Sequence, residues 1–181
     1  MQYQDCVLEA QDEAADSDNA MSAGQALCDA RLAEANINPQ TGLATDYLNH
    51  FNEAIMLLEM AGNSPDCLAD FQDWQPMGYR EHFLESRLKD RDLAIAAYVA
   101  ADPAARACLD TLAGTMITVI ESTRSTISGD VPAQAAGIVS ERAAKWLKKL
   151  VVRAGAVING EIDLREIEAP QLTADRVTRR V

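Results

Sequence analysis

Apolar residues recur at intervals of three and four positions along most of this 181-residue chain. That spacing places them on one face of an α-helix, whereas a half-buried strand would alternate them at every second position. The clearest case is residues 45–61, whose apolar stripe consists of Tyr47, Leu48, Phe51, Ala54, Ile55 and Leu58. Because no stretch shows strand alternation between turn signals, the sequence predicts an all-α fold.

Prolines, glycines and capping side chains mark where the helices are expected to begin and end. Ser64-Pro65 and Asp102-Pro103 each place a capping side chain before a proline at the first helical position. Asn159-Gly160 is a helix stop, because both residues tolerate left-handed backbone geometry. The long helices are expected at residues 45–61, 79–101, 103–128 and 132–158. Four long helices with shorter ones between them predict a helical bundle.

Residue spacing predicts the core faces of two of these helices, 79–101 and 132–158. The cluster Lys89-Asp-Arg-Asp92 interrupts the helix at 79–101, so a kink and a second helix capped by Asp90 are both open. Its core face is expected to hold Leu84, Leu88, Ile95 and Tyr98. The core face of 132–158 is expected to hold Ala135, Ile138, Val139, Ala143, Trp146, Leu147, Leu150, Val151, Ala154 and Val157.

Composition divides the chain into an acidic helical arm (1–40), a bundle core (41–160) and a C-terminal tail or docking helix (161–181). In the arm, seven acidic residues precede the first basic residue, Arg31. They are Asp5, Glu9, Asp12, Glu13, Asp16, Asp18 and Asp29. Helical spacing predicts a helix at the start of the arm and a second one that turns Leu27, Cys28 and Leu32 inward.

Charge and cysteine usage narrow the classes of partner and compartment. The chain has 28 acidic and 16 basic residues and a net charge of −12, which disfavours nucleic acid and anionic membranes as partners. No apolar run approaches the roughly 18 residues of a membrane helix, and the first residues lack the basic start and apolar run of a signal peptide. The four cysteines form no C-x-x-C pair. We therefore expect a cytoplasmic protein with reduced cysteines.

The sequence Tyr-x-x-His-Phe-x-Glu occurs twice, from Tyr47 to Glu53 and from Tyr79 to Glu85. The chain has 2 histidines, and one lies in each copy. On a helix, residues three or four apart share a face, so each copy presents a His/Glu pair beside a Tyr/Phe pair. The aromatic pairs are expected to be core.

One interpretation of the His/Glu pairs is a metal site. Imidazole and carboxylate groups from two facing helices could hold zinc or iron. The candidate ligands are Asp46, His50, Glu53, His82 and Glu85. The order His-x-x-Glu is the reverse of the Glu-x-x-His motif of carboxylate-bridged di-iron bundles, so that class is not indicated.

The other interpretation is that the His/Glu pairs have a structural role, and the residues favour it. A histidine at a helix boundary is commonly satisfied by a neighbouring carboxylate, which Asp46 or Glu53 supplies for His50. Glu85 has Lys89 four residues later, the favourable order for an ion pair along a helix. Such an ion pair would remove the Glu85 carboxylate from a metal site.

A basic stripe follows the last long helix. It consists of Arg142, Lys145, Lys149 and Arg153, with Lys148 beside it. This stripe could be a solvated face, could neutralise the acidic arm within one chain or between two, or could bind an acidic partner or phosphate groups. Pairing with the arm of a second copy would give a homodimer.

Together these features favour a non-enzymatic helical-bundle protein that acts through contacts with a protein partner or a second copy. One alternative is a metal-binding protein or enzyme that uses the paired motif. Another is a binder of a small apolar ligand between the Tyr/Phe pairs and Trp74. No nucleophile–base pattern and no Gly-rich phosphate loop is present, so no catalytic residue is assigned and no cofactor is expected besides the alternative zinc or iron.

Overall fold

The computed structural model of the protein describes residues 25–61, 64–128 and 131–162. Residues 25–34 are helical. They are followed by a 3₁₀ turn η1 (Thr45–Tyr47), α2 (Leu48–Ala61), α3 (Pro65–Asp73), α4 (Tyr79–Glu85), α5 (Arg91–Ala100), α6 (Pro103–Ile127) and α7 (Ala133–Ile158). These ranges contain no β-strand, only an isolated bridge between Ile37 and Ala44. The prediction of an all-α fold is confirmed.

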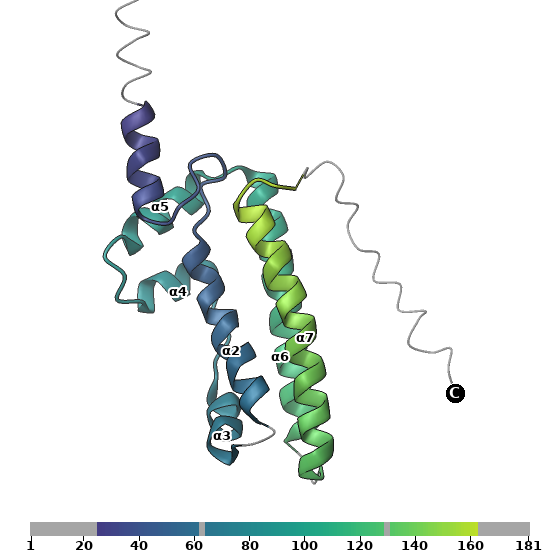
Figure 1. The fold of residues 1–181 in the computed structure, drawn as a ribbon. Coiled ribbons are helices and arrows are strands. Elements are labelled where there is room, and N and C mark those ends of the chain that lie inside the picture. The colour runs from purple at the N-terminus through teal and green to yellow at the C-terminus, as the bar shows by residue number, and fades with distance from the viewer. Residues whose placement is uncertain (1–24, 62–63, 129–130, 163–181) are drawn as a thin grey trace, which may run out of the picture.

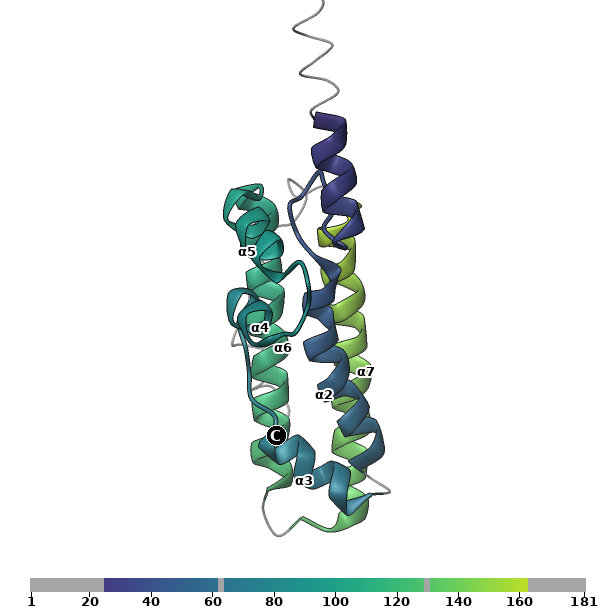
Figure 2. The same cartoon turned by 90° about the vertical axis from the view of Figure 1, so that its left-hand side faces the viewer.

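Helix α7 packs against both α2 and α6. It runs opposite to both of them, and α3 crosses the bundle at the end where α2 stops (Figures 1 and 2). The short helices α4 and α5 lie on the side of α2 and α6 that is away from α7. The centre is filled by fully buried side chains, among them Phe51, Leu58, Leu109, Met116, Ile120 and Leu147.

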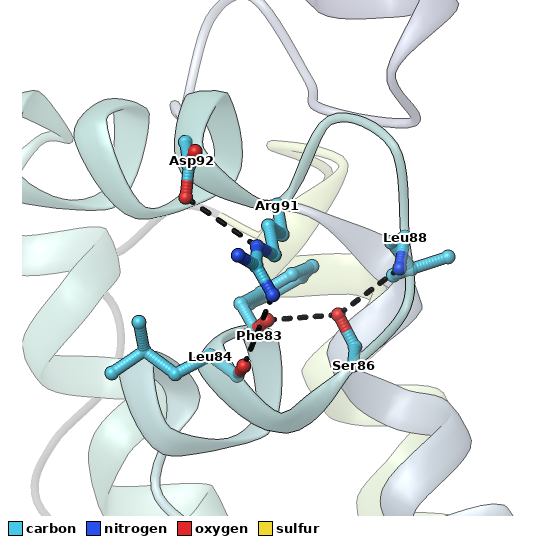
Figure 3. A network of polar contacts seen from close by, with 6 residues as sticks. All are labelled: Phe83, Leu84, Ser86, Leu88, Arg91 and Asp92. Atoms are coloured by element: carbon cyan, nitrogen blue, oxygen red, sulfur yellow. Dashed lines mark hydrogen bonds and ion pairs between the residues drawn. The ribbon is translucent and has the colours of Figure 1, made fainter.

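The predicted helix at 79–101 is two helices, α4 and α5. Figure 3 shows the contacts that end helix α4 at Ser86. The Ser86 hydroxyl donates to the carbonyl of Phe83 at 2.8 Å and accepts from the N–H of Leu88 at 3.4 Å. Arg91 then reaches back and donates to the carbonyl of Leu84 at 3.4 Å. These bonds use the last carbonyls of α4, which otherwise would bond to a further helical turn. The described chain therefore has three long helices rather than four.

This break also removes the continuous core face that was expected along 79–101. Leu84 is 49% exposed and Leu88 is 40% exposed, whereas Ile95 and Tyr98 are half-buried. Because α4 ends at Glu85, Lys89 is not one turn further along the same helix. The ion pair predicted between Glu85 and Lys89 is not among those formed in the described chain.

Local capping chemistry sets the other helix ends as predicted. The Ser64 hydroxyl accepts from the N–H of Cys67 at 3.4 Å, which starts α3. The Asp102 carboxylate accepts from the N–H groups of Ala104 and Ala105 at 3.0 and 2.9 Å, which starts α6. Gly160 has a φ of +70° just after α7 ends, as a left-handed helix stop requires.

The loop at 35–44, which precedes η1 and α2, contacts the end of α7 and helix α5. Ile37 and Leu43 are fully buried, and Thr41 donates through its hydroxyl to the last α7 carbonyl, of Ile158, at 2.6 Å. Gly42 has a φ of +71° and lies so close to α5 that a Cβ there would be 3.0 Å from the carbonyl oxygen of Ala97. Part of the predicted 1–40 arm thus already packs with the core.

The rest of the predicted arm and tail lies mainly outside the described residues, which begin at 25 and end at 162. The division into arm, core and tail therefore stays a prediction. Within 25–34, Leu27 is 74% exposed and Cys28 is also exposed, so the prediction that both face inward is wrong, while Leu32 does pack against the core. None of the helices in the described ranges is long and apolar enough to cross a membrane.

Candidate functional site

The two copies of Tyr-x-x-His-Phe-x-Glu, on η1–α2 and on α4, pack against each other. The ring centroids of Tyr47 and Tyr79 are 5.1 Å apart, and those of His50 and His82 are 5.8 Å apart. Tyr47, Tyr79 and their partners Phe51 and Phe83 are all buried. Because such aromatic contacts add to the free energy of area burial, the pair is a strong packing element. The prediction that the aromatic faces are core is confirmed.

His50 is held by groups that neither motif contains. Its ring is 3% exposed and stacks on the indole of Trp74, with centroids 4.4 Å apart and planes at 22°. Its Nε2 accepts a hydrogen bond from the backbone N–H of Met77 at 3.1 Å. Burial, together with the charge of nearby His82, lowers the pKa of His50 to about 4. His50 is therefore neutral near pH 7, with its Nε2 lone pair already used.

The tyrosine hydroxyls bind backbone rather than solvent. Tyr79 Oη accepts from the N–H of Ala44 at 2.9 Å, and the Tyr47 hydroxyl donates to the carbonyl of Met77 at 3.1 Å. Burial raises the pKa of both phenols, so neither ionises near neutrality. The Tyr47 and His50 bonds hold Met77, in the irregular segment between α3 and α4, by its carbonyl and its N–H respectively.

The predicted metal ligands are only partly brought together. His50 and His82 lie side by side, while Glu53 and Glu85 are exposed. Asp46 is half-buried, and its carboxylate accepts from the Asn36 amide at 3.3 Å. Burial lowers the pKa of His82, and the backbone and carboxylate of Asp46 oppose that shift. In the described ranges, no group of three or more His, Cys, Asp or Glu is placed to hold a metal ion.

The apolar-ligand alternative was expected to show a cavity bounded by the two Tyr/Phe pairs. There the rings contact one another, at 5.3 Å for Tyr47–Phe51 and 4.8 Å for Tyr79–Phe83. A surface groove is present elsewhere, between α6 and α7. The apolar-ligand alternative stays a prediction without a cavity at the expected residues.

The exposed side of α7 differs most from expectation. Trp146 and Ile138 were expected in the core, but they are 64% and 49% exposed. At about 100° per residue, Ile138 lies on the opposite side of the helix from buried Leu147, nine positions later. The predicted core face was too wide for one helix, and this width is the signal in the sequence that could have identified an exposed apolar surface.

Trp146 forms the edge of the groove between α6 and α7, which has a volume of about 430 Å³. The groove is lined only from these two helices, by Thr118, Val119, Ser122, Thr123, Val139, Arg142, Ala143 and Trp146. None of its lining residues comes from α2, α4 or α5, so it opens along the seam between α6 and α7. We call these eight residues, together with Ile138, Lys145, Lys149 and Arg153, the docking face.

The α7 side of the docking face is cationic. Arg142, Lys145, Lys149 and Arg153 are all exposed. Lys145 pairs with Glu141 one turn earlier at 2.7 Å. No ion pair within the described ranges involves the other three cations, whereas Lys148, beside the stripe, pairs across to Glu59 on α2. The stripe therefore presents positive charge along one rim of the groove.

The side chains on the α6 side of the docking face are small and uncharged. The Thr118 hydroxyl donates to the Gly114 carbonyl at 2.9 Å, and the Thr123 hydroxyl to the Val119 carbonyl at 2.7 Å. Thr111 and Thr115, nearer the start of α6, bond their own helix in the same way. A threonine bonded to its own helix does not need a partner's hydrogen bond, so another backbone can approach closely.

The chain matches no protein-family model, no curated protein and no solved structure. Its function is therefore inferred from its own residues.

Proposed function

We propose that this protein acts through protein–protein contacts, and that its docking face binds an acidic amphipathic helix. The observation that carries the proposal is Trp146, which is 64% exposed at the edge of a groove. Covering that indole would contribute roughly 2.5–4 kcal/mol, taking 25 cal/mol per Å² of apolar surface. Trp and Arg are also the residues that most often dominate the binding free energy of protein interfaces.

The shape and charge of the docking face favour a helix as the partner. A groove between two antiparallel helices offers the ridges and hollows into which a third helix packs. The uncharged α6 side permits close approach, and the cations on α7 favour a partner with carboxylates along one flank. Val139, which also lines the groove, lies about two turns before Trp146 and extends the apolar contact along α7.

A polypeptide suits this surface better than a polyanion does. Nucleic acid and anionic membranes carry dense negative charge, and the net charge of −12 on this chain would repel both at long range. An acidic helix is repelled less, because its few carboxylates can be matched individually by Arg142, Lys149 and Arg153. We also propose a cytoplasmic location, which the free thiols of Cys28, Cys67 and Cys108 in the described ranges support.

The proposal is tested with a fluorescein-labelled synthetic peptide, an amphipathic helix of Leu, Ala and Glu, titrated with the full-length protein and followed by anisotropy. We expect Trp146→Ala and Arg142→Glu each to weaken binding at least about tenfold. Matched controls are Val99→Ala, an exposed apolar residue on α5, and Arg80→Glu, an exposed cation on α4. Equal losses in the controls would show nonspecific attraction instead.

A metal site at the paired motif is the second candidate function, and the proximity of His50 and His82 is the observation that favours it. A bound ion would need the His50 ring to give up the Met77 hydrogen bond, or to use Nδ1 instead. Elemental analysis of untagged protein tests this candidate. Stoichiometric zinc or iron that is lost in His82→Ala would support it, and metal-free protein that gains no thermal stability from added zinc would exclude it.

A further inference from the structure

We propose that the helix bound at the docking face is the acidic N-terminal segment, residues 1–24, of a second copy of this chain. Two copies would then associate by exchanging these segments. This inference rests on the proposed function and names its partner. Charge, apolar spacing, length and the point where the segment joins the bundle each support it.

Charge is the first support. Residues 1–24 contain acidic side chains and no Lys, Arg or His. The acidic residues are Asp5, Glu9, Asp12, Glu13, Asp16 and Asp18. The docking face has the opposite composition, with four exposed cations on α7 and no carboxylate among its residues. Exposed ion pairs contribute only about 0–1 kcal/mol each, so charge gives register and salt dependence while apolar contact supplies affinity.

Apolar spacing is the second support. Tyr3, Val7, Ala10 and Ala14 follow one another at intervals of four and three, which is one stripe at helical spacing. On the same helical projection, Glu9 and Glu13 lie along one flank of that stripe. Up to residue 15, the opposite flank has Leu8, Gln11 and Ala15 and no charge.

The docking face has the matching asymmetry. Its α7 rim carries Arg142 and Lys149, and its α6 rim carries Thr118 and Ser122. A helix whose apolar stripe lies in the groove would place one flank along each rim. Glu9 and Glu13 then face the cations, and the uncharged flank faces the hydroxyl-bearing helix. The reverse orientation would leave the cations against uncharged residues, so only one alignment satisfies both rims.

Length is the third support. A helix over residues 1–15 would span roughly 22 Å at 1.5 Å per residue, which leaves residues 16–24 as the connection to residue 25. The stretch of α7 from Arg142 to Arg153 spans roughly 17 Å on the same rise. The segment is therefore long enough to cover the whole basic stripe and the Trp146 groove, with residues left over to connect to residue 25.

The place where the segment joins the bundle indicates a second copy as the source. The helical stretch at 25–34 is fastened to the start of α5, where Arg31 pairs with Asp90. Its first residues extend beyond the end of the bundle, above α5 in Figure 1, whereas the groove is lined by α6 and α7. To reach its own groove the segment would have to reverse and cross the bundle end. The groove of a second copy imposes no such reversal.

The test uses full-length protein with two sets of charge reversals, and its readout is mass by size-exclusion chromatography with light scattering. The segment-reversed variant carries Glu9→Lys, Glu13→Lys and Asp16→Lys. The face-reversed variant carries Arg142→Glu, Lys149→Glu and Arg153→Glu. All six positions are outside the described range or exposed, and circular dichroism confirms folding of each variant. We expect wild-type protein to be a dimer that dissociates with salt, and each variant alone to have a dimer dissociation constant at least about tenfold higher.

Mixing the two variants decides the source of the segment. In an exchange between copies, the mixture regains the dimer, because the cationic segment of one variant meets the anionic face of the other. A variant that carries both sets of charge reversals on one chain should also form a dimer. A mixture that stays monomeric, or wild-type protein that is monomeric at every concentration, overturns the exchange.

The labelled-helix titration separates this inference from the proposed function. If that helix binds at Trp146 while the protein is a monomer, the docking face serves another partner and the exchange is wrong. If neither the helix nor a second copy binds, both proposals fail.

Discussion

At the scale of single residues, His50 makes a contact that depends on pH. It is buried against Trp74 and accepts from Met77 in its neutral form, with a pKa lowered from 6.5 to about 4. Between those two pH values the unfolded chain takes up a proton that the folded chain does not, so stability is complete above pH 6.5 and falls as the pH drops toward 4. The largest loss from this one group is roughly 3 kcal/mol.

The variant His50→Gln tests this contact, because its amide oxygen can still accept from Met77 but does not titrate. Urea denaturation across pH 4 to 7 should give a free energy of unfolding that falls less steeply in the variant, by roughly 3 kcal/mol at pH 4 relative to pH 7. Carboxylates contribute their own slope to both proteins, which the difference removes. Parallel curves for wild type and variant would contradict a neutral, buried His50.

Not every feature of this histidine could be predicted from the sequence. The burial of Tyr47 and Phe51 follows from their spacing on one helix, which is local information. The stacking of Trp74 and the Met77 hydrogen bond join a helix to an irregular segment about 25 residues later, and no periodicity describes such a contact. The pattern therefore identified the paired motif but not the partners that satisfy its imidazole.

At the scale of elements, the loop at 35–44 depends on a glycine. Gly42 has a φ of +71°, and a Cβ there would lie 3.0 Å from Ala97 O and 3.1 Å from Ala101 Cα. Gly42→Ala should therefore lower the free energy of unfolding by roughly 2–3 kcal/mol. Gly114→Ala is the matched control, since nothing lies within 4 Å of its Cβ and it is inside helix α6. The control should stabilise the protein by roughly 1 kcal/mol.

Thermal and urea denaturation of these two variants give both values. The opposite signs are the informative result, because the same chemical change is made at both positions. A Gly42→Ala variant as stable as wild type would mean that the loop is not fastened to α5 in solution.

Helix starts that depend on local caps were predicted well, whereas the break after Glu85 and the helix faces were predicted less well, for a physical reason. The starts of α3 and α6 depend on Ser64 and Asp102, whose caps act within three residues. The break after Glu85 depends on Arg91 reaching back to Leu84, and the exposure of Trp146 depends on where α6 and α2 sit around α7. These are relations between elements, so residue spacing along one helix does not determine them.

At the scale of the whole molecule, the structure leaves an apolar and cationic seam uncovered in a strongly acidic protein. The described chain pairs only some of its α7 cations, and its largest exposed aromatic side chain lies beside them. Association through this seam would cover Trp146 and bring opposite charges together without altering the bundle. The expected consequence is a change in solvent access at one tryptophan only.

Acrylamide quenching of Trp146 fluorescence is the most direct measurement of that consequence. The signal of Trp146 is the difference between wild type and Trp146→Phe, in which the remaining Trp74 is only 6% exposed. At concentrations where the wild type is a dimer, Trp146 should be quenched weakly, and the segment-reversed variant should show at least about threefold stronger quenching as its indole becomes exposed to solvent. Equal, strong quenching of Trp146 in both proteins would contradict occupation of the docking face by the acidic segment.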